Sequence, residues 1–317
     1  MEFLQYAVRK LLGGIPLILG VSFISFLLMV YYGPDQTFEL LGKNPTAEQI
    51  AEVRHELGYD RSFAVRYAEY LQQIATLDFG LSDSSGEPVS SMLGRSIPIS
   101  LALVTPGFIL GNLLGILLAL VAAYHRSGLV DKVIMGFAVV GMSISFLIVI
   151  IAFQILLSSS YGLNLFPVRG WNVHSVQDYI MYVTVPTLAS VFVTLGYNTR
   201  FYRAVIVEEM TRDHVRTARA FGVPPIKLLY KHILKNAAIP IITRIMFSIP
   251  LVVVSGSLLI ESYFGIPGVG KVTFDAITTG DQPVLKAVVG LTAVLFVLTL
   301  LITDILYRAV DPRVSLK

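Results

Sequence analysis

Cysteine is absent from this sequence, and charged residues are scarce in it. Without cysteine the chain has no disulfide, no thiolate metal site and no cysteine nucleophile. Charged residues fill 14% of the 317 positions, whereas soluble domains carry about 25%. Hydrophobic residues fill 55% of the positions. This balance predicts that lipid surrounds much of the folded chain.

Histidine, net charge and motif content exclude further classes of protein. The five histidines are scattered without the spacing of metal ligands, so we expect no metal site. A net charge of +3 argues against a nucleic-acid partner. Paired carboxylates and a serine nucleophile motif are also missing, so we expect no catalytic residue and no enzyme activity.

Six apolar segments are long enough to cross a membrane. A spanning helix needs about 20 apolar residues, because lipid cannot hydrogen-bond a free backbone group. The segments are residues 11–32, 97–124, 133–157, 179–197, 237–260 and 287–307. The first has too long an apolar core for a secretory signal and no cleavage motif, so we expect it to be retained. We therefore predict an all-α integral membrane protein with six transmembrane helices.

Lysine and arginine gather in the loops of one side. If the N-terminus is cytoplasmic, 15 of the 24 basic residues lie inside. The first outer loop then holds ten acidic and five basic residues. Because positive charge favours the cytoplasmic side, we expect both termini there.

The chain divides by hydropathy into three parts. These are residues 1–32, with the first helix, an outer loop element at 33–96, and a five-helix core at 97–317. The outer element contains two amphipathic stretches, 46–57 and 63–77, and the first begins with a capping-box pattern at Thr46 and Gln49. This small folded element either meets a soluble partner or covers the membrane helices.

The cytoplasmic loop at 200–235 predicts a helix, a tight turn and a second helix. Gly222 before Pro224 is typical of a left-handed helix end, and Pro225 suits a first helical turn. Phe221, flanked by small residues, suits insertion into a cleft of another protein. One face of the second helix carries lysines four residues apart: Lys227, Lys231 and Lys235. That face alone is typical of contact with anionic lipid.

At this loop the sequence resembles the permeases of binding-protein-dependent ABC importers. Their signature reads Glu-Ala-Ala, three residues, then Gly. The residues that the resemblance assigns to the ATPase-coupling loop are Arg216, Thr217, Ala218, Arg219, Ala220, Phe221, Gly222 and Val223. Arginine and threonine replace the first two family residues, and Arg-Thr-Ala-Arg-Ala is similar to the dipeptide and oligopeptide branch. Further matching patches lie at 6–28, 57–60, 77–80, 264–270 and 306–313, whereas Tyr-Gly-Pro-Asp at 32–35 departs from the family's Pro-Gly-Asp-Pro.

The resemblance implies a type I importer permease fold in a bacterial inner membrane. It also implies partners: a second permease, two ATPase subunits that use ATP and Mg, and an external substrate-binding protein. The chain itself would bind no cofactor, and its coupling helix would correspond to residues 211–223. Peptides are the expected substrate, with dipeptides, longer peptides, glutathione, nickel chelates and antimicrobial peptides all open.

A glycine-rich segment at 265–272 fits the phosphate-binding loop pattern except at its last position. Val272 stands there, and valine cannot ligate magnesium as serine or threonine does. We therefore interpret the segment as a rigid turn near the outer gate, formed by Gly265, Pro267, Gly268 and Gly270.

Two charged residues lie inside predicted membrane helices. Arg244 is about 10 Å from the cytoplasmic end of its helix at 1.5 Å per residue, and Asp304 has a similar depth. Charges in lipid are commonly paired, so we predict that these two meet each other or the second permease. Snorkelling to the interface is the simpler alternative.

A secondary, ion-coupled transporter of small solutes is the alternative function, because six helices do not specify an energy source. Such a transporter needs carboxylates deep in the membrane to carry protons or sodium. The deepest acidic residue, Asp304, lies near a helix end, which disfavours this alternative.

Overall fold

The computed structural model describes residues 2–33, 37, 41–42, 45–253 and 257–310. Helices dominate these residues, and the strand-like pairing within them is an isolated bridge between Leu81 and Pro88. Three sequence predictions fall partly outside the described residues, at 34–35, 254–256 and 311–313.

The chain forms two compact units. One combines Met1–Ile99 with Pro267–Leu301, and the other combines Ser100–Ile266 with Ile302–Lys317. The boundaries predicted from hydropathy, after residues 32 and 96, follow a different division and stay predictions.

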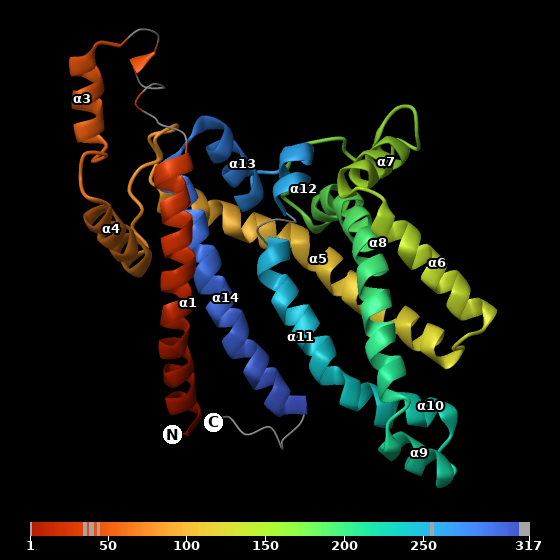
Figure 1. Cartoon of the computed structure of the whole chain (residues 1–317). Helices are drawn as coiled ribbons and strands as arrows, with labels where there is room; N and C mark the ends of the chain where they lie inside the picture. Colours follow the sequence, from red (N-terminus) through yellow and green to blue (C-terminus); the bar gives the residue numbers. More distant parts are fainter. Residues whose placement is uncertain (1, 34–36, 38–40, 43–44, 254–256, 311–317) are drawn as a thin grey trace. The chain divides into compact units, whose positions relative to one another are not determined.

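The first unit is built from helices at the two ends of the chain (Figure 1). Its helices are α1 (Glu2–Tyr32), α3 (Ala47–Glu56), α4 (Phe63–Thr76), the first turns of α5 (Val89–Tyr124), α13 (Val269–Thr279) and most of α14 (Gln282–Val310). The two amphipathic stretches of the outer loop are thus helices, as predicted. The capping box at Thr46 and Gln49 is confirmed, and α4 ends at Leu77 with a left-handed backbone.

Aromatic side chains join α4 to α1. Phe26 lies 5.3 Å from the ring centroid of Phe63 and stacks on Tyr70 at 5.4 Å, and Phe23 meets Tyr67 edge-on at 5.4 Å. Phe26 and Tyr70 are buried. Aromatic pairs in these arrangements add stabilisation beyond the area that they bury. In this unit α4 therefore covers a membrane helix, one of the two roles left open for the outer element, whereas α3 has no buried residue.

In the same unit α14 makes close contacts with α4 and α1. Tyr70 donates a hydrogen bond to the Lys286 carbonyl oxygen at 3.0 Å. A Cβ on Gly290 would lie 2.9 Å from the Ile74 side chain, and one on Gly14 would lie 2.5 Å from Val297. Glycine thus lets α14 approach both α4 and α1.

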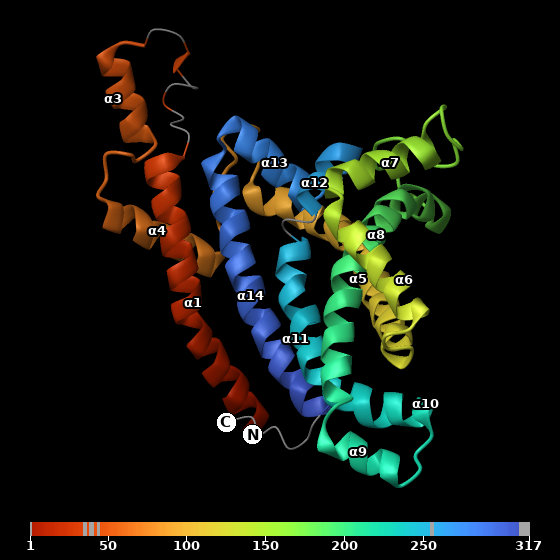
Figure 2. The ribbon, with the colours of Figure 1, turned by 45° about the vertical axis from the view of Figure 1, so that its right-hand side comes forward.

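The second unit contains the centre of the chain (Figure 2). Its helices are the rest of α5, α6 (Leu129–Ser143), α7 (Phe146–Ser158), α8 (Val176–Glu209), α9 (Asp213–Ala220), α10 (Pro225–Lys227), the π-helical turn η1 (Leu228–Leu234), α11 (Lys235–Leu251), α12 (Ser257–Phe264) and the end of α14. Three glycines four residues apart on α5 face three polar residues four residues apart on α8. The facing pairs are Gly107 with Ser190, Gly111 with Thr194, and Gly115 with Asn198. This stripe lets two long helices pack at close range.

Among the described residues, five helices are long and apolar enough to cross a membrane, or six if one bent pair counts as a span. The bent pair corrects the predicted third span, which we expected to be one helix over 133–157. Here α6 and α7 meet at 100°, because Ile144 and Ser145 adopt extended backbone with ψ of 132° and 135°. Ser143 also donates its hydroxyl to the Val139 carbonyl at 2.8 Å, a local bond that bends helices.

Two other predicted spans differ most from their expected limits. The fourth, expected at 179–197, is the 34-residue helix α8. The fifth, expected at 237–260, is a continuous helical segment from Pro225 to Leu251, followed after the undescribed residues 254–256 by α12. The second helix of the predicted loop is thus the beginning of a membrane-length helix, since no glycine or proline interrupts it between Ile226 and Ile239.

Candidate functional site

The predicted coupling loop, residues 211–223, packs against neighbouring helices through the buried face of α9. Val215 and Ala218 of α9 are buried in a cluster with Tyr202 and Ile206 of α8. The same cluster includes residues that follow in the chain, such as Leu228, Ile233 and Ala237, and two alanines of α5. α8, α9 and the start of the next long helix therefore share one apolar core, which packs the loop against both of the helices that flank it.

The tip of this loop is exposed. Phe221 is 85% exposed, and Gly222 has the left-handed backbone predicted for it, with a φ of +75°. The turn closes through two hydrogen bonds, from Gly222 N to Arg219 O at 3.0 Å and from Val223 N to Ala218 O at 3.2 Å. A rigid turn thus presents a large apolar side chain to its surroundings.

The other predicted loop residues fall on both faces. Those exposed are Arg216, Thr217, Arg219 and Ala220. Ala218 is buried and Val223 is partly buried. The signature alanine therefore belongs to the packing face, whereas the remaining small and basic residues are exposed, as Phe221 is.

A polar network that the sequence analysis missed fixes the base of the loop. Glu209, 9% exposed at the end of α8, lies 3.0 Å from Arg212 Nε and 3.3 Å from His214 Nε2. Asn236 Nδ2 lies 2.9 Å from His214 Nε2 and also donates to the His232 carbonyl at 2.8 Å. These bonds join the end of α8, the start of α9 and the first turn of α11.

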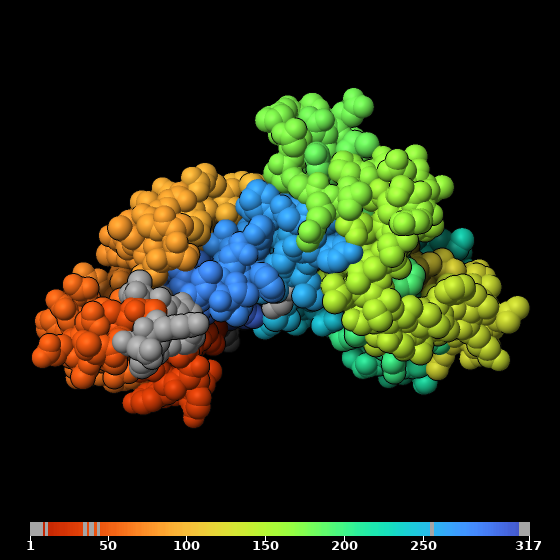
Figure 3. Space-filling view, turned by 90° about the horizontal axis from the view of Figure 1, so that it is seen from above, coloured from red at the N-terminus to blue at the C-terminus, as the bar shows by residue number. Residues whose placement is uncertain are grey.

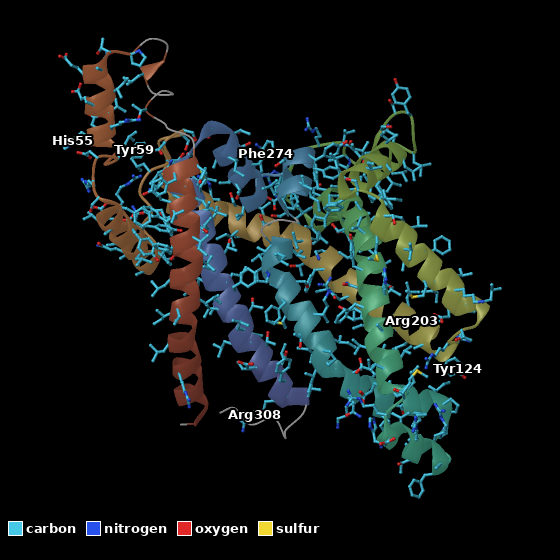
Figure 4. The ribbon with its side chains drawn as sticks, viewed as in Figure 1. His55, Tyr59, Tyr124, Arg203, Phe274 and Arg308 are labelled. Carbon is cyan, nitrogen blue, oxygen red and sulfur yellow. The ribbon has the colours of Figure 1, made fainter. Side chains whose placement is uncertain are left out.

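A second missed pair joins α6 to α8. Arg203, marked in Figure 4, donates to both carboxylate oxygens of Asp131, at 2.5 Å each. The Asp131 side chain is 5% exposed and that of Arg203 is 23% exposed, and the Ser127 amide donates to the same carboxylate at 2.9 Å. Bidentate arginine–carboxylate pairs fix the relative orientation of the two side chains and also stabilise the fold. One end of the bent pair is therefore tied to α8.

The residues of the predicted outer-gate turn follow α12 in the chain and extend into the first turn of α13. Gly265 has a φ of +68°, and Gly268 caps α13, in whose first turn Gly270 is buried. Lys271 Nζ lies 2.6 Å from Asp275 Oδ2, so this lysine has a carboxylate partner, unlike the lysine of a phosphate-binding loop. The gating role of the turn, including that of Pro267, stays a prediction.

A buried carboxylate stabilises the turn between α13 and α14. Asp281 accepts bonds from the Ser82 hydroxyl at 2.5 Å and the Ser84 hydroxyl at 2.8 Å. Figure 3 shows the segment that leads into α5, in orange, lying against the blue α13 region of the same unit. Burial acts to raise the pKa of Asp281, but these hydrogen bonds from Ser82 and Ser84 outweigh it and hold the pKa below its ordinary value.

Arg244 lies in α11, with its guanidinium carbon 5.7 Å from the centre of the Phe201 ring. Its Nε is buried, and no described residue bonds to it. Asp304, near the end of α14, is partly buried and has partners of its own. A charge pair between Arg244 and Asp304, or with a partner subunit, stays a prediction.

Comparison with known families decides the identity of this architecture. A model described as "Binding-protein-dependent transport system inner membrane component" matches residues 111–316. The chain belongs to this family. The N-terminal model of the same transport systems matches residues 3–104 of the permease. The two matches together cover both the loop that carries the signature and the outer element.

Individual relatives of the permease cover nearly the whole chain. It is 35% identical to the dipeptide transport permease DppB of Lactococcus lactis, over 86% of this chain and 87% of the relative. Its identity to DppB of Bacillus subtilis is 30%, over 98% of each chain. Its identity to the glutathione transport permease GsiC of Salmonella choleraesuis is 32%, over 99% of this chain and 100% of the relative.

A solved structure supports the fold. The permease resembles a chain from inward-facing structures of the MetNI methionine ABC transporter with a TM-score of 0.55. The match has 17% identity and covers 69% of this chain and 96% of the other. The permease therefore has the type I importer permease fold that the sequence resemblance implied.

Proposed function

We propose that this chain is one of two permease subunits of an ATP-driven importer that carries di- and oligopeptides across a bacterial inner membrane. An external binding protein delivers the peptide, and two separate ATPase subunits hydrolyse ATP with Mg. The chain itself binds no cofactor and catalyses no reaction. The relatives named for dipeptide transport support the choice of peptides.

The observation that carries this proposal is the exposed Phe221 on a rigid turn. A side chain of this size with 85% exposure is unfavourable in water and well suited to a cleft of a partner protein. The buried face of α9 fixes the turn to α8 and to the helix that begins at Pro225, so closure of the ATPase pair would rotate these helices as a body.

The charge distribution supports the orientation of the proposed assembly. Because lysine and arginine favour the cytoplasmic side, their distribution supports a cytoplasmic location for the loop and for both termini. Three exposed lysines beside the loop would contact anionic lipid headgroups: Lys227, Lys231 and Lys235.

The test changes Phe221, the exposed residue at the tip of the loop, and leaves the buried residues of α9 unchanged. In the complete importer, Phe221→Glu should abolish ATP-dependent peptide uptake and recovery of the ATPase subunits with the permease, while the permease still inserts. Arg308→Gln, an exposed change at the far end of α14, is the matched control and should behave as wild type. Normal uptake by the Phe221 variant would refute the proposal.

The energy source separates this proposal from an ion-coupled transporter. Uptake into proteoliposomes should require ATP inside the compartment that holds the ATPase subunits and should continue when ion gradients are collapsed. Uptake that persists without ATP and follows an ion gradient would favour the alternative.

A further inference from the structure

A cavity of about 310 Å³ lies in the second compact unit, lined mainly by α5, α8 and α11. Its walls are largely apolar, and Arg244 is the one charged residue among the described residues that line it. The polar lining residues come from three helices: Asn112, Ser190, Thr194, Tyr197, Asn198 and Ser248. Ligand sites typically combine apolar walls with a few polar groups that set the orientation of the ligand.

Arg244 contributes a guanidinium to the wall of the cavity, and its Nε lacks a hydrogen-bond partner among the described residues. That Nε is buried, and no partner for it occurs in the part of the chain that the structure describes. The guanidinium carbon lies 5.7 Å from the centre of the Phe201 ring. Because a guanidinium is a donor at every nitrogen and accepts nothing, its missing partner is an acceptor, and an anion satisfies it best.

The hydroxyl groups around the cavity have the opposite character. The hydroxyls of Ser190, Thr194 and Ser248 donate to carbonyls of their own helices, at 2.8, 2.8 and 2.7 Å. Each hydroxyl hydrogen is thus already donated, so these oxygens can act toward a ligand only as hydrogen-bond acceptors. The cavity therefore combines one cationic donor with a wall of neutral acceptors.

The amide groups complete the same pattern. Asn112 Oδ1 accepts from Tyr202 at 2.5 Å and from Asn198 Nδ2 at 3.2 Å, and Asn112 Nδ2 donates to the Phe108 carbonyl at 2.8 Å. These bonds fix the α5–α8 wall, and they direct the Asn198 amide nitrogen and one N–H of Asn112 to protein acceptors. An acceptor wall facing a guanidinium matches a molecule with a carboxylate at one end and N–H groups along its length.

We propose that Arg244 binds the carboxylate of a short peptide while the peptide passes through this cavity, with its N–H groups toward the hydroxyl oxygens of α8. This inference rests on the proposed function and extends it to a contact inside the membrane. Ligand pockets span about 300–1,000 Å³, so a volume of about 310 Å³ suits di- and tripeptides. A free carboxylate is the one anionic group that all such peptides share.

The test uses the assembled importer with both permeases and both ATPase subunits. Binding is measured by saturation-transfer NMR without the binding protein, using dialanine and its C-terminal amide as probes. The wild-type complex should give a dialanine signal at least fivefold stronger than the amide signal. Arg244→Gln should reduce the dialanine signal to that of the amide, and Arg244→Lys, which keeps the charge, should restore at least a third of it.

Transport and ATP hydrolysis are then measured in proteoliposomes with saturating, loaded binding protein. Arg244→Gln should lower dialanine and trialanine uptake at least tenfold while stimulated ATP hydrolysis stays within twofold of wild type. Arg308→Gln, outside the cavity, is the control and should leave both rates unchanged. This split separates a lost substrate contact from a lost subunit contact.

Four results would overturn the assignment. They are wild-type uptake by Arg244→Gln, equal binding of dialanine and its amide, loss of assembly or of ATP hydrolysis in proportion to uptake, and an identical phenotype in Asp304→Asn. The third would place Arg244 at a subunit interface, and the fourth would assign it to an internal charge pair. Absence of peptide uptake by the wild-type importer would overturn the proposed function itself, before any variant is compared.

Discussion

Gly111 of α5 lies so close to Thr194 of α8 that a methyl group on the glycine would overlap the threonine hydroxyl. Close approaches recur one helical turn away on either side, where a Cβ on Gly107 would lie 3.1 Å from Ser190 Cβ and one on Gly115 would lie 2.8 Å from Asn198 Cβ. The contact explains why α5 carries glycine at this spacing although glycine disfavours helices.

Alanine at position 111 should therefore destabilise the permease. We expect Gly111→Ala to cost about 1–3 kcal/mol, the usual effect of overpacking. Adding Thr194→Ala removes the overlapping oxygen and should recover at least half of the loss in a double-mutant cycle. Unfolding of the purified chain in detergent measures both.

The matched control is Gly136→Ala on α6. A Cβ there meets no atom within 4 Å, so this variant should be neutral or slightly stabilising. Equal destabilisation by the two alanines would show that the α5–α8 contact does not govern the effect, because the higher helix propensity of alanine would by itself stabilise both variants.

The pair between Arg203 and Asp131 predicts an asymmetry between single and double variants. Arg203→Ala leaves a buried carboxylate without its partner and should cost about 3–5 kcal/mol. The double variant with Asp131→Ala should cost less than Arg203→Ala alone. Chemical denaturation gives the comparison, and additive effects would contradict it.

An exposed ion pair is the control for that experiment. Arg61 and Glu69 lie 2.6 Å apart with side chains 55% and 47% exposed. Exposed pairs contribute about 0–1 kcal/mol, so Arg61→Ala should change stability little. A loss as large as that of Arg203→Ala would mean that pairing distance, and not burial, sets the energy.

The Asp281 carboxylate predicts a loss of stability in acid. Its pKa in the folded chain is below the ordinary value of 3.8, so its contribution is present above about pH 4 and is lost as pH falls through the folded pKa. Ser82→Ala should cost about 1.5–3 kcal/mol near neutrality, the range for a bond to a charged group.

The difference between wild type and Ser82→Ala should narrow below about pH 4, as protonation removes the charge. Thermal unfolding measured from pH 6 to pH 3 shows this directly. A constant difference across that range would mean that the serine acts through packing and not through the carboxylate.

Phe221 and Val215 predict opposite consequences for stability and activity. Phe221→Ala removes a side chain that is 85% exposed and should change the free energy of unfolding by less than about 0.5 kcal/mol. Val215→Ala removes methyl groups from a fully buried position and should cost about 1–3 kcal/mol. Uptake should fall more in the Phe221 variant than in the Val215 variant, which a transport assay at matched expression tests.

Local features of the fold could be read from the sequence because their causes lie within a few residues. The capping box at Thr46 and the left-handed Gly222 depend on side chains or backbone freedom in one turn. The family signature located the loop, and hydropathy located the membrane helices.

Features that depend on distant partners could not be read in this way. The bend between α6 and α7 falls at Ile144 and Ser145, where no proline or glycine marks a break. The bond of Arg203 to Asp131 joins positions 72 apart in the chain, and that of Ser82 to Asp281 joins positions 199 apart. A sequence shows which residues carry a charge or a hydroxyl group, but it does not show which of these residues will be in contact in the folded chain.

The helical path from Pro225 to Leu251 has a mechanical consequence. It passes from α10 through the π-helical turn η1 into α11, and Figures 1 and 2 show α10 at an angle to α11. Helices bend at π-helical turns and at prolines, and α11 contains Pro240. A force applied at the loop would therefore reach α11 through a bend, and the stiffness of that bend would set how much of a displacement arrives at Leu251.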